Sequence, residues 1–292
     1  MTKCKRVVIT GADRGIGREL AIALTNRGHH VFVTGLDEKA LRAVAKKCHT
    51  PNEWAVCDVR YCGQLSTVIG KAEHRMGRID AVVANAGIAR QMATDDPEFR
   101  DELERTLDVN LFGGINTATV ARPYLAKTNG YMLFISSAAG LVNPPLMTPY
   151  NVSKAGIRAY AETFRFEVMP EDIKVGVATF TELDTDMTRI GFATEASEYL
   201  VTVRFKIGDK VLLQRRILPV AKLEPAIKAL VRGVERKRRH VHSPRRVLWL
   251  RLLPAFHQRV LIETFVRPRV KKALELARQE NGQCATILPP SN

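Results

Sequence analysis

Long hydrophobic runs are missing from this sequence of 292 residues. No apolar stretch reaches the roughly 20 residues that a membrane-spanning helix needs. The opening Met-Thr-Lys-Cys-Lys-Arg leads directly into the strand-like run Val7–Thr10, with neither the longer apolar stretch nor the small-residue cleavage site of a secretory signal. We therefore expect no membrane span, no signal peptide and a cytoplasmic location.

Cysteine is also scarce, and its five residues are irregularly spaced: Cys4, Cys48, Cys57, Cys62 and Cys284. An odd number of cysteines without a secretory signal is typical of reduced thiols rather than of a disulfide framework. Cys57 and Cys62 would suggest a metal-binding pair, but no second pair or histidine cluster accompanies them. We therefore expect buried or incidental thiols and no metal.

Acidic residues are outnumbered, 30 against 45 lysines and arginines, which gives a formal net charge of +15. Most of the excess lies at residues 232–272, where thirteen basic residues accompany two acidic ones. The stretch 247–272 interleaves Leu, Trp and Phe with arginine, a pattern typical of an amphipathic helix on an anionic membrane surface. Packing on the body or on a partner subunit is the alternative, and Pro254 and Pro268 interrupt any single long helix. Nucleic-acid binding is not expected, because no recognised module surrounds the charges.

Between residues 5 and 245, short runs rich in β-branched residues alternate with longer amphipathic stretches. Strands are expected at residues 7–10, 31–34, 54–57, 81–84, 131–136, 174–180 and 240–242, and helices at 16–27, 38–48, 64–76, 99–125, 150–169 and 224–236. This alternation predicts βαβ units that build a parallel sheet covered by helices on both faces. The expected fold class is α/β, a Rossmann-type doubly wound sheet of about seven strands. It would form one domain at residues 1–245, followed by a basic C-terminal extension at 246–292.

Gly11, Gly15 and Gly17 follow the first expected strand, and Ile16 opens the helix after it. Glycine at these positions allows a tight turn, a close approach of the backbone to a pyrophosphate, and close packing of helix on strand. The N-terminal amides of the helix would then point at the phosphates. A purely structural turn would also use glycine, but the position between strand and helix in the first βαβ unit favours nucleotide binding.

The Gly-x3-Gly-x-Gly spacing of this turn resembles that of the short-chain dehydrogenase/reductase family, classical type. Further motifs follow in the family's order, up to about residue 187: Asp58-Val59, Asn85-Ala86-Gly87, Asn110, Ser137, Tyr150 and Lys154. The resemblance implies an NAD(P)-dependent oxidoreductase that transfers a hydride between nicotinamide and a carbonyl or secondary alcohol. It also implies a homodimer or homotetramer built through the helices at Phe99–Leu125 and Tyr150–Met169.

The resemblance assigns roles to several residues. Asp58 would lie near the adenine amino group, Lys154 would bind the nicotinamide ribose, and Asn110 would hold a water that relays protons to that lysine. Thr185 would contact the carboxamide, although the Pro-Gly that usually precedes it is replaced by Phe180-Thr181. Glycine permits backbone angles and a close approach that threonine resists, so we expect the nicotinamide to be seated differently here.

Tyr150, Lys154 and Ser137 carry the expected chemistry. Reduction of a carbonyl needs a proton donor at the developing alkoxide, but free tyrosine, with a pKa of about 10, is a poor base at neutral pH. A lysine four residues later lies on the same helix face, and its charge, with that of oxidised nicotinamide, would favour tyrosinate. Ser137 would hydrogen-bond the substrate oxygen. Tyr-x3-Lys alone is common on amphipathic helices, so the prediction depends on the ordered set of motifs.

The expected cofactor contacts include the turn and the end of the second strand: Gly11, Asp13, Arg14, Gly15, Ile16, Gly17, Leu36 and Asp37. An acidic residue at that strand end would repel a 2′-phosphate, and Gly35 stands where NAD-dependent relatives carry a selective aspartate. Leu36 stands where NADP-preferring relatives often carry arginine. Arg14 matches another basic position common among them, and a solvated loop arginine is its alternative interpretation. NADP(H) is therefore favoured over NAD(H).

The family's substrate lid would lie at residues 186–219. Its larger apolar residues would line a pocket for a lipophilic substrate opposite residues 144–147, or would pack the lid on the body. They are Met187, Ile190, Phe192, Tyr199, Leu200 and Phe205. A hypothesis from another class is a nucleotide-binding sensor or scaffold that keeps the fold but turns over little. The enzyme is favoured by the intact catalytic set: Asn110, Ser137, Tyr150 and Lys154.

Overall fold

The computed structural model describes residues 4–49, 53–191, 194–207, 210–216, 219–244, 247, 264 and 267–279. Within these residues, seven parallel strands form the main sheet in the order β3-β2-β1-β4-β5-β6-β9, which confirms the expected α/β fold. The strands are β1 (Arg6–Ile9), β2 (His30–Gly35), β3 (Trp54–Val56), β4 (Ala81–Ala84), β5 (Tyr131–Ser137), β6 (Lys174–Phe180) and β9 (His240–Ser243). The strand order reverses between β1 and β4, where open α/β sheets form their ligand-binding crevice.

The central strands are continuous apolar runs because helices cover both of their faces. Every residue of β4 is buried, as are the first six residues of β5. Valine and isoleucine suit these positions, since branched side chains pack well on a pleated surface. Because the strands are parallel, their carboxyl ends lie in one row, and the candidate site is built along that row.

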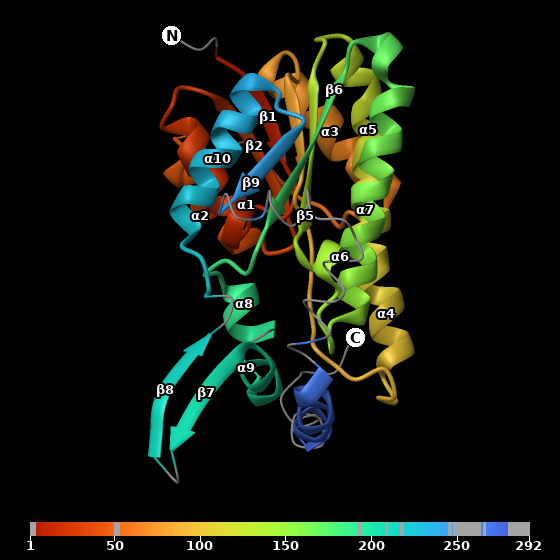
Figure 1. Ribbon diagram of the computed structural model, residues 1–292. Helices are drawn as coiled ribbons and strands as arrows, with labels where there is room; N and C mark the ends of the chain where they lie inside the picture. Colours follow the sequence, from red (N-terminus) through yellow and green to blue (C-terminus); the bar gives the residue numbers. More distant parts are fainter. Residues whose placement is uncertain are drawn as a thin grey trace.

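Two helical layers cover the sheet, as Figure 1 shows. One layer consists of α1 (Gly15–Thr25), α2 (Glu38–Lys47) and α10 (Leu223–Arg236), and the other of α3 (Cys62–Met76), α5 (Gly113–Ala126) and α7 (Thr148–Glu167). Each layer closes its own apolar core. Leu20 and Leu230 lie in the first core, and Leu65 and Phe164 lie in the second. The sheet is therefore doubly wound.

The stretch 99–125 is not the single continuous helix that its amphipathic pattern predicts. It divides into α4 (Phe99–Leu107), a π-helix over Asp108–Phe112, and α5. A π-helical turn accommodates one additional residue, and such turns are frequent at functional sites. Here the turn carries Asn110, whose side chain is buried.

The lid segment 186–219 contains a hairpin that the sequence did not predict. Helices α8 (Asp186–Gly191) and α9 (Glu195–Val201) are followed by the antiparallel strands β7 (Thr202–Ile207) and β8 (Lys210–Arg216). Figure 1 shows this hairpin extending away from the main sheet. Of the residues expected to line the lid, Leu200 is buried. Phe192 lies outside the described residues, as do the side chains of Ile190 and Phe205.

Part of the basic C-terminal extension packs on the body. Residues 267–279 include a helix, and its buried apolar side chains form one cluster with residues of the lid and of two loops: Ala273, Leu276, Ala277, Ala93, Leu146, Ala196 and Leu200. Arg278 forms an ion pair with Asp95 at 2.6 Å. These packed residues follow the stretch 247–272, so they do not decide between the packing and membrane interpretations of that stretch. Trp249 and Phe256, on which the membrane interpretation depends, are not among the described residues.

The structure also bears on whether a helix of this chain could cross a membrane. In the part of the chain that the structure describes, no helix combines the length and the apolar character needed to cross a bilayer.

A substitution at Gly176 of β6 tests how tightly the sheet is packed. A methyl group on it would lie 2.2 Å from the Tyr131 hydroxyl and 2.3 Å from the carbonyl oxygen of Arg238, to which that hydroxyl donates at 2.7 Å. We expect Gly176→Ala to lower the free energy of unfolding by at least about 2 kcal/mol, because overpacking and a disturbed buried hydrogen bond both contribute. Urea denaturation measures the change.

The matched control is Gly63→Ala at the start of α3, where nothing lies within 4 Å of the added methyl group. It should leave stability unchanged or raise it by up to about 1 kcal/mol, since alanine favours the helix. Equal stability of Gly176→Ala and the wild type would contradict the packing described.

Candidate active site

The glycine turn lies at the carboxyl end of β1, beside the residues that follow β4. Gly11 has a left-handed backbone (φ +60°), and a methyl group on it would lie 2.6 Å from Cα of Ala86. A methyl group on Gly17 would lie 2.5 Å from the carbonyl oxygen of Gly11. Any side chain at these positions would push the turn, α1 and the loop after β4 apart. This close approach is what a dinucleotide-binding turn requires of its glycines.

Asn85 braces the turn from the side of β4. Its amide nitrogen donates to the carbonyl oxygens of Thr10 and Gly11 at 2.9 and 2.8 Å. The Thr10 hydroxyl accepts from the backbone N–H groups of Asn85 and Ala86 at 3.0 and 3.2 Å. The structure thus brings the Asn85-Ala86-Gly87 motif against the glycine turn, although the two are far apart in the sequence.

The start of α1 fits a phosphate group. Gly15 has φ +54°, and nothing lies within 4 Å of where its side chain would be. No side chain caps the helix at Arg14, so the first amides, with their partial positive charge, face this space. Ile16 packs on the core below. The Arg14 side chain is exposed and forms no ion pair within the described ranges.

The carboxylate of Asp13, from the glycine turn, lies at the end of β2, a contact that the sequence did not predict. A methyl group on Gly35 would lie 2.9 Å from the carboxyl carbon of Asp13. The Asp13 carboxylate also accepts from the backbone N–H of Asp37 at 3.3 Å, and Asp37 caps α2 by accepting from Ala40. Leu36 is 64% exposed beside them. Asp13 therefore supplies a carboxylate at the strand end where Gly35 itself has none.

Asp58 and Val59 follow β3, and Arg60 engages the carboxylate of Asp58. The guanidinium donates to one carboxylate oxygen through Nη2 at 2.6 Å and Nε at 2.9 Å. Burial raises the pKa of Asp58, but the hydrogen bonds from Arg60 outweigh it and hold the pKa below its usual value. Val59 is buried against Gly113, where a methyl group would lie 2.4 Å from the valine side chain. Arg60 is thus a partner of the Asp58-Val59 motif that the sequence pattern did not indicate.

Ser137 and Tyr150 come together beyond the end of β5. Ser137 is the last residue of that strand, and Tyr150 lies in the first turn of α7 with 9% of its surface exposed. Burial raises the pKa of Tyr150 to about 12, and a hydrogen bond with Ser137 acts against that rise. The Ser137 hydroxyl also accepts from the backbone N–H of Ala139 at 3.1 Å. Ser136 is committed elsewhere, because its hydroxyl donates to the carbonyl oxygen of Lys154 at 2.9 Å.

The ammonium group of Lys154 is buried beside Tyr150. Its Nζ donates to the carbonyl oxygen of Ile135 at 3.1 Å and lies 5.4 Å from the centre of the Tyr150 ring. No carboxylate pairs with it in the described part of the chain. Burial lowers the pKa of Lys154 from its usual 10.5 to about 8. Gly87 lies beside the group, and a methyl group on it would be 3.4 Å from Nζ and 3.2 Å from Oδ1 of Asn110.

Asn110 ties the π-helix to the loop after β4. Its amide nitrogen donates to the carbonyl oxygen of Ile88 at 2.9 Å, and its Oδ1 accepts from the N–H of Ile88 at 2.8 Å. The amide also donates to Oγ of Ser153 at 3.0 Å, next to Lys154 in α7. Asn110, the fourth predicted catalytic residue, therefore lies with the other three. Its hydrogen-bond partner Ser153 was not predicted from the sequence.

Thr181 and Thr185 follow β6. Thr181 is not among the described residues with a left-handed backbone, so this position does not require glycine. Its hydroxyl is buried and has no hydrogen-bond partner within the described residues. Thr185 accepts from the backbone N–H of Thr188 at 3.4 Å at the start of α8. Thr185 therefore lies at the junction between the sheet and the lid.

The structure also describes the potential metal ligands and four of the cysteines. The described residues hold no group of three or more His, Cys, Asp or Glu side chains that could bind a metal ion. Cys48 and Cys57 are buried, Cys4 and Cys62 are exposed, and all four are free thiols. Burial raises the pKa of Cys57 to about 11, so its thiol stays protonated at neutral pH.

Comparison with known proteins agrees with this geometry. Residues 5–196 match the family model described as short chain dehydrogenase. The chain belongs to the short-chain dehydrogenase/reductase family of oxidoreductases, whose members bind NAD(P).

Similar individual proteins come from plants. The chain is 30% identical to 11-beta-hydroxysteroid dehydrogenase A of Sesamum indicum over 258 residues, which are 85% of this chain and 70% of that protein. It is 30% identical to 11-beta-hydroxysteroid dehydrogenase 1A of Arabidopsis thaliana over 244 residues, 82% of this chain and 68% of that one. It is 32% identical to 11-beta-hydroxysteroid dehydrogenase-like 6 of Arabidopsis thaliana over 246 residues, with coverages of 82% and 70%.

Lys154→Met tests whether the ammonium group is buried at a cost in stability. At 1.36 kcal/mol per pKa unit, a pKa lowered from 10.5 to about 8 costs about 3 kcal/mol at neutral pH. Between these two values the unfolded chain binds more protons than the folded one, so wild-type stability rises with pH. We expect the stability of Lys154→Met relative to wild type to fall by about 2 kcal/mol between about pH 7 and about pH 9.5. Denaturant unfolding at several pH values measures it.

Lys71→Met, on the exposed face of α3, is the matched control and should show no such trend. A stability difference for Lys154→Met that does not change with pH would contradict the burial of a charged group.

Proposed function

We propose that the protein is an NAD(P)-dependent oxidoreductase that transfers a hydride between nicotinamide and a carbonyl or secondary alcohol. The observation that carries this proposal is the arrangement of Tyr150, Ser137 and Lys154. Tyr150 shares a hydrogen bond with Ser137, and its ring centre lies 5.4 Å from the Lys154 ammonium group. This cluster lies along the same row of strand ends as the glycine turn, where α/β sheets bind their ligands.

The cofactor contacts follow the row of strand ends. The glycine turn and the amides at the start of α1 would bind the pyrophosphate. Asp58 and Val59 would lie at the adenine, the loop Asn85–Gly87 along the cofactor, and Lys154 at the nicotinamide ribose. Thr185 would contact the carboxamide.

The chain's own groups would move the proton. When bound, nicotinamide supplies or accepts the hydride. Tyr150 donates its hydroxyl proton to the substrate oxygen in reduction and takes it back in oxidation. Ser137 hydrogen-bonds the same oxygen and holds it beside Tyr150. Lys154 stabilises tyrosinate by its charge, and Asn110 would hold a water that returns a proton to Lys154.

A lipophilic substrate is supported by the apolar surroundings of the site. Leu146 and Met147 are buried just before Tyr150, and residues 267–279 pack on Leu146 and on Leu200 of the lid. Small-molecule pockets in general are mostly apolar and hold the ligand through a few polar groups. Because the similar plant proteins are named 11-beta-hydroxysteroid dehydrogenases, a hydroxysteroid and its ketone are the first pair to test.

Self-association is supported by exposed apolar side chains on the expected helices. Phe112 in the π-helix and Val152 in α7 are 51% and 46% exposed. Apolar groups left in water on neighbouring elements favour a partner surface, so we propose a homodimer or homotetramer through this face. Contact of residues 247–272 with a membrane stays a prediction.

Tyr150→Phe tests the proton transfer. Removing the hydroxyl should lower kcat for ketone reduction at least about a hundredfold, since a positioned acid contributes that much, while cofactor affinity changes little. Turnover against a panel of ketones, with cofactor binding measured in parallel, checks both quantities.

Tyr160→Phe is the control, because it removes a hydroxyl from the same helix where the ring stacks on Phe164 at 5.5 Å. It should keep wild-type turnover. If Tyr150→Phe also kept it, the proposed mechanism would be wrong. Cofactor binding without turnover by the wild type would favour the sensor or scaffold instead.

Arg14→Gln tests cofactor choice. We propose NADP(H) as the preferred cofactor because the exposed Arg14 guanidinium can reach a 2′-phosphate. Its attraction would outweigh the repulsion of the 2′-phosphate by the nearby Asp13 carboxylate. The substitution should lower kcat/KM for NADPH about tenfold and leave that for NADH unchanged, since one charge-assisted contact is lost. Arg18→Gln, one turn later and ion-paired with Glu19, serves as control. A wild type that prefers NADH would overturn the proposal.

A further inference from the structure

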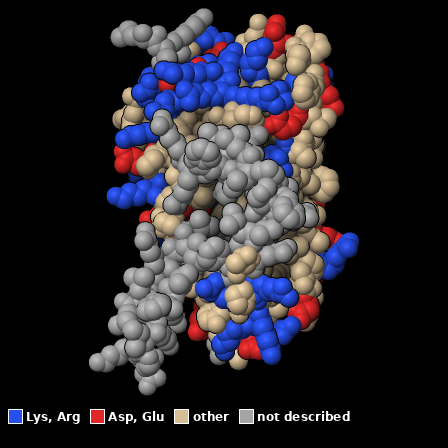
Figure 2. Space-filling model, in the orientation of Figure 1, with Lys and Arg blue, Asp and Glu red and all other residues tan. Residues whose placement is uncertain are grey.

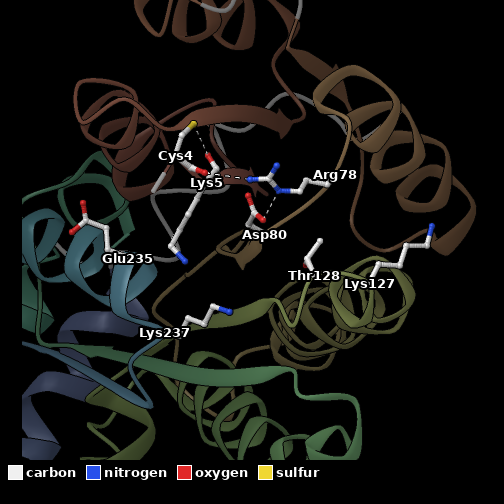
Figure 3. Close-up of a pocket in the computed structure, with 8 residues that line it drawn as sticks. All are labelled: Cys4, Lys5, Arg78, Asp80, Lys127, Thr128, Glu235 and Lys237. Carbon is white, nitrogen blue, oxygen red and sulfur yellow. Dashed lines mark hydrogen bonds and ion pairs between the residues drawn. The ribbon is translucent and has the colours of Figure 1, made fainter. Parts of the chain in front are cut away.

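A hollow lies at the opposite end of the sheet from Tyr150. It has a volume of about 550 Å³ and lies where β1, β4, β5 and β9 begin. Figure 3 shows its lining, in which four side chains are cationic: Lys5, Arg78, Lys127 and Lys237. Lys5 and the glycine turn lie at the two ends of β1, roughly 20 Å apart at about 3.3 Å per residue. The hollow is therefore separate from the candidate active site.

The two acidic residues of the hollow are already engaged. Asp80 accepts from Nε of Arg78 at 2.8 Å and from the backbone N–H of Arg6 at 2.7 Å. Glu235 accepts from Nε of Arg27 at 2.6 Å. Neither carboxylate forms an ion pair with Lys5 or Lys237 within the described residues. Asp80 and Glu235 thus act on Lys5 only through space.

Lys5 and Lys237 direct their charges into the same space. Figure 3 shows the ammonium groups of Lys5 and Lys237 on the same side of the hollow, to the left of Asp80 and Thr128 in this view, while Lys127 extends away from them. Lys237 also donates to the carbonyl oxygen of Asn129. Burial and the charge of Lys237 lower the pKa of Lys5, and they outweigh the opposite effect of the Asp80 and Glu235 carboxylates. Two cations that repel each other in a half-buried hollow are stabilised by an anion between them.

The surrounding surface is basic as well. Arg232, Arg236 and Arg238 are exposed near the end of α10 and the start of β9. Figure 2 shows lysine and arginine side chains gathered at this end of the molecule. Such a field attracts anions and raises their local concentration. Residues 232–239 lie at this end of the molecule, whereas residues 267–279 pack at the lid.

We infer that this hollow is a binding site for a phosphate-bearing anion, held between the ammonium groups of Lys5 and Lys237. A terminal phosphate offers several acceptor oxygens, so each lysine can donate a charge-assisted hydrogen bond to it. The phosphate belongs either to a soluble phosphate ester or to a lipid headgroup, since both present the same group. Hydride transfer at Tyr150 does not depend on this site.

Calorimetric titration of the full chain with inorganic pyrophosphate tests the proposal, with saturating NADP(H) present so that the glycine turn is already occupied. The variant Lys5→Gln/Lys237→Gln should bind at least about tenfold more weakly than the wild type, because two charged contacts are lost. Glutamine at position 5 removes a repelling, half-buried charge, so the fold should tolerate it. The control Lys46→Gln/Lys71→Gln removes the same charge from exposed positions on α2 and α3 and should bind like the wild type.

Two results would overturn the proposal: pyrophosphate binding by Lys5→Gln/Lys237→Gln as tight as that of the wild type, or no binding by the wild type. With the glycine turn occupied, the first would place the anion at another surface than the hollow. Sedimentation with phosphatidylcholine vesicles, with and without a phosphoinositide, distinguishes the sources. Phosphoinositide-dependent sedimentation that the double variant loses indicates a lipid headgroup. Pyrophosphate binding without sedimentation indicates a soluble ester.

Discussion

A positive charge held out of water is the constraint on which the candidate active site depends. The ammonium group of Lys154 has the carbonyl oxygen of Ile135 as its acceptor at 3.1 Å. Burial opposes the charged forms of both neighbours, raising the pKa of Tyr150 to about 12 and lowering that of Lys154 to about 8. A carboxylate beside the lysine would neutralise its field. In the described part of the chain none pairs with it, so in the mechanism we propose the lysine charge would favour tyrosinate once oxidised nicotinamide adds further positive charge.

The fold builds this environment from a strand, a helix and a π-helix that meet at the carboxyl-terminal edge of the sheet. Strand β5 provides the acceptor at Ile135 and ends in Ser137, while α7 carries Tyr150 and Lys154 one turn apart. The π-helix adds Asn110, which is fixed to the loop after β4 on one side and to Ser153 of α7 on the other. These residues are distant in sequence but adjacent in space, because the carboxyl ends of parallel strands share one edge of the sheet.

The sequence predicts the repetitive parts of this structure better than its local departures. Apolar strands and amphipathic helices alternate strongly enough to identify the seven-stranded sheet, and motif order identifies the family. Periodicity could not reveal the π-helix at 108–112, because a single wide turn interrupts the helical pattern only briefly. The contacts of Asp13 with Gly35 and of Arg60 with Asp58 depend on side-chain positions that no spacing rule encodes. The basic run 232–272 appeared as one feature, yet its described parts lie at opposite ends of the fold.

The pKa of Tyr150 with and without oxidised cofactor is the most direct test of the central claim. Tyrosinate absorbance of the wild type, with that of a Tyr150→Phe variant subtracted, isolates this one ring. The account predicts a pKa near 12 without cofactor and a clear fall when oxidised cofactor binds, with the fall much reduced once Lys154 is replaced by methionine. A pKa that stays the same with and without cofactor would contradict it.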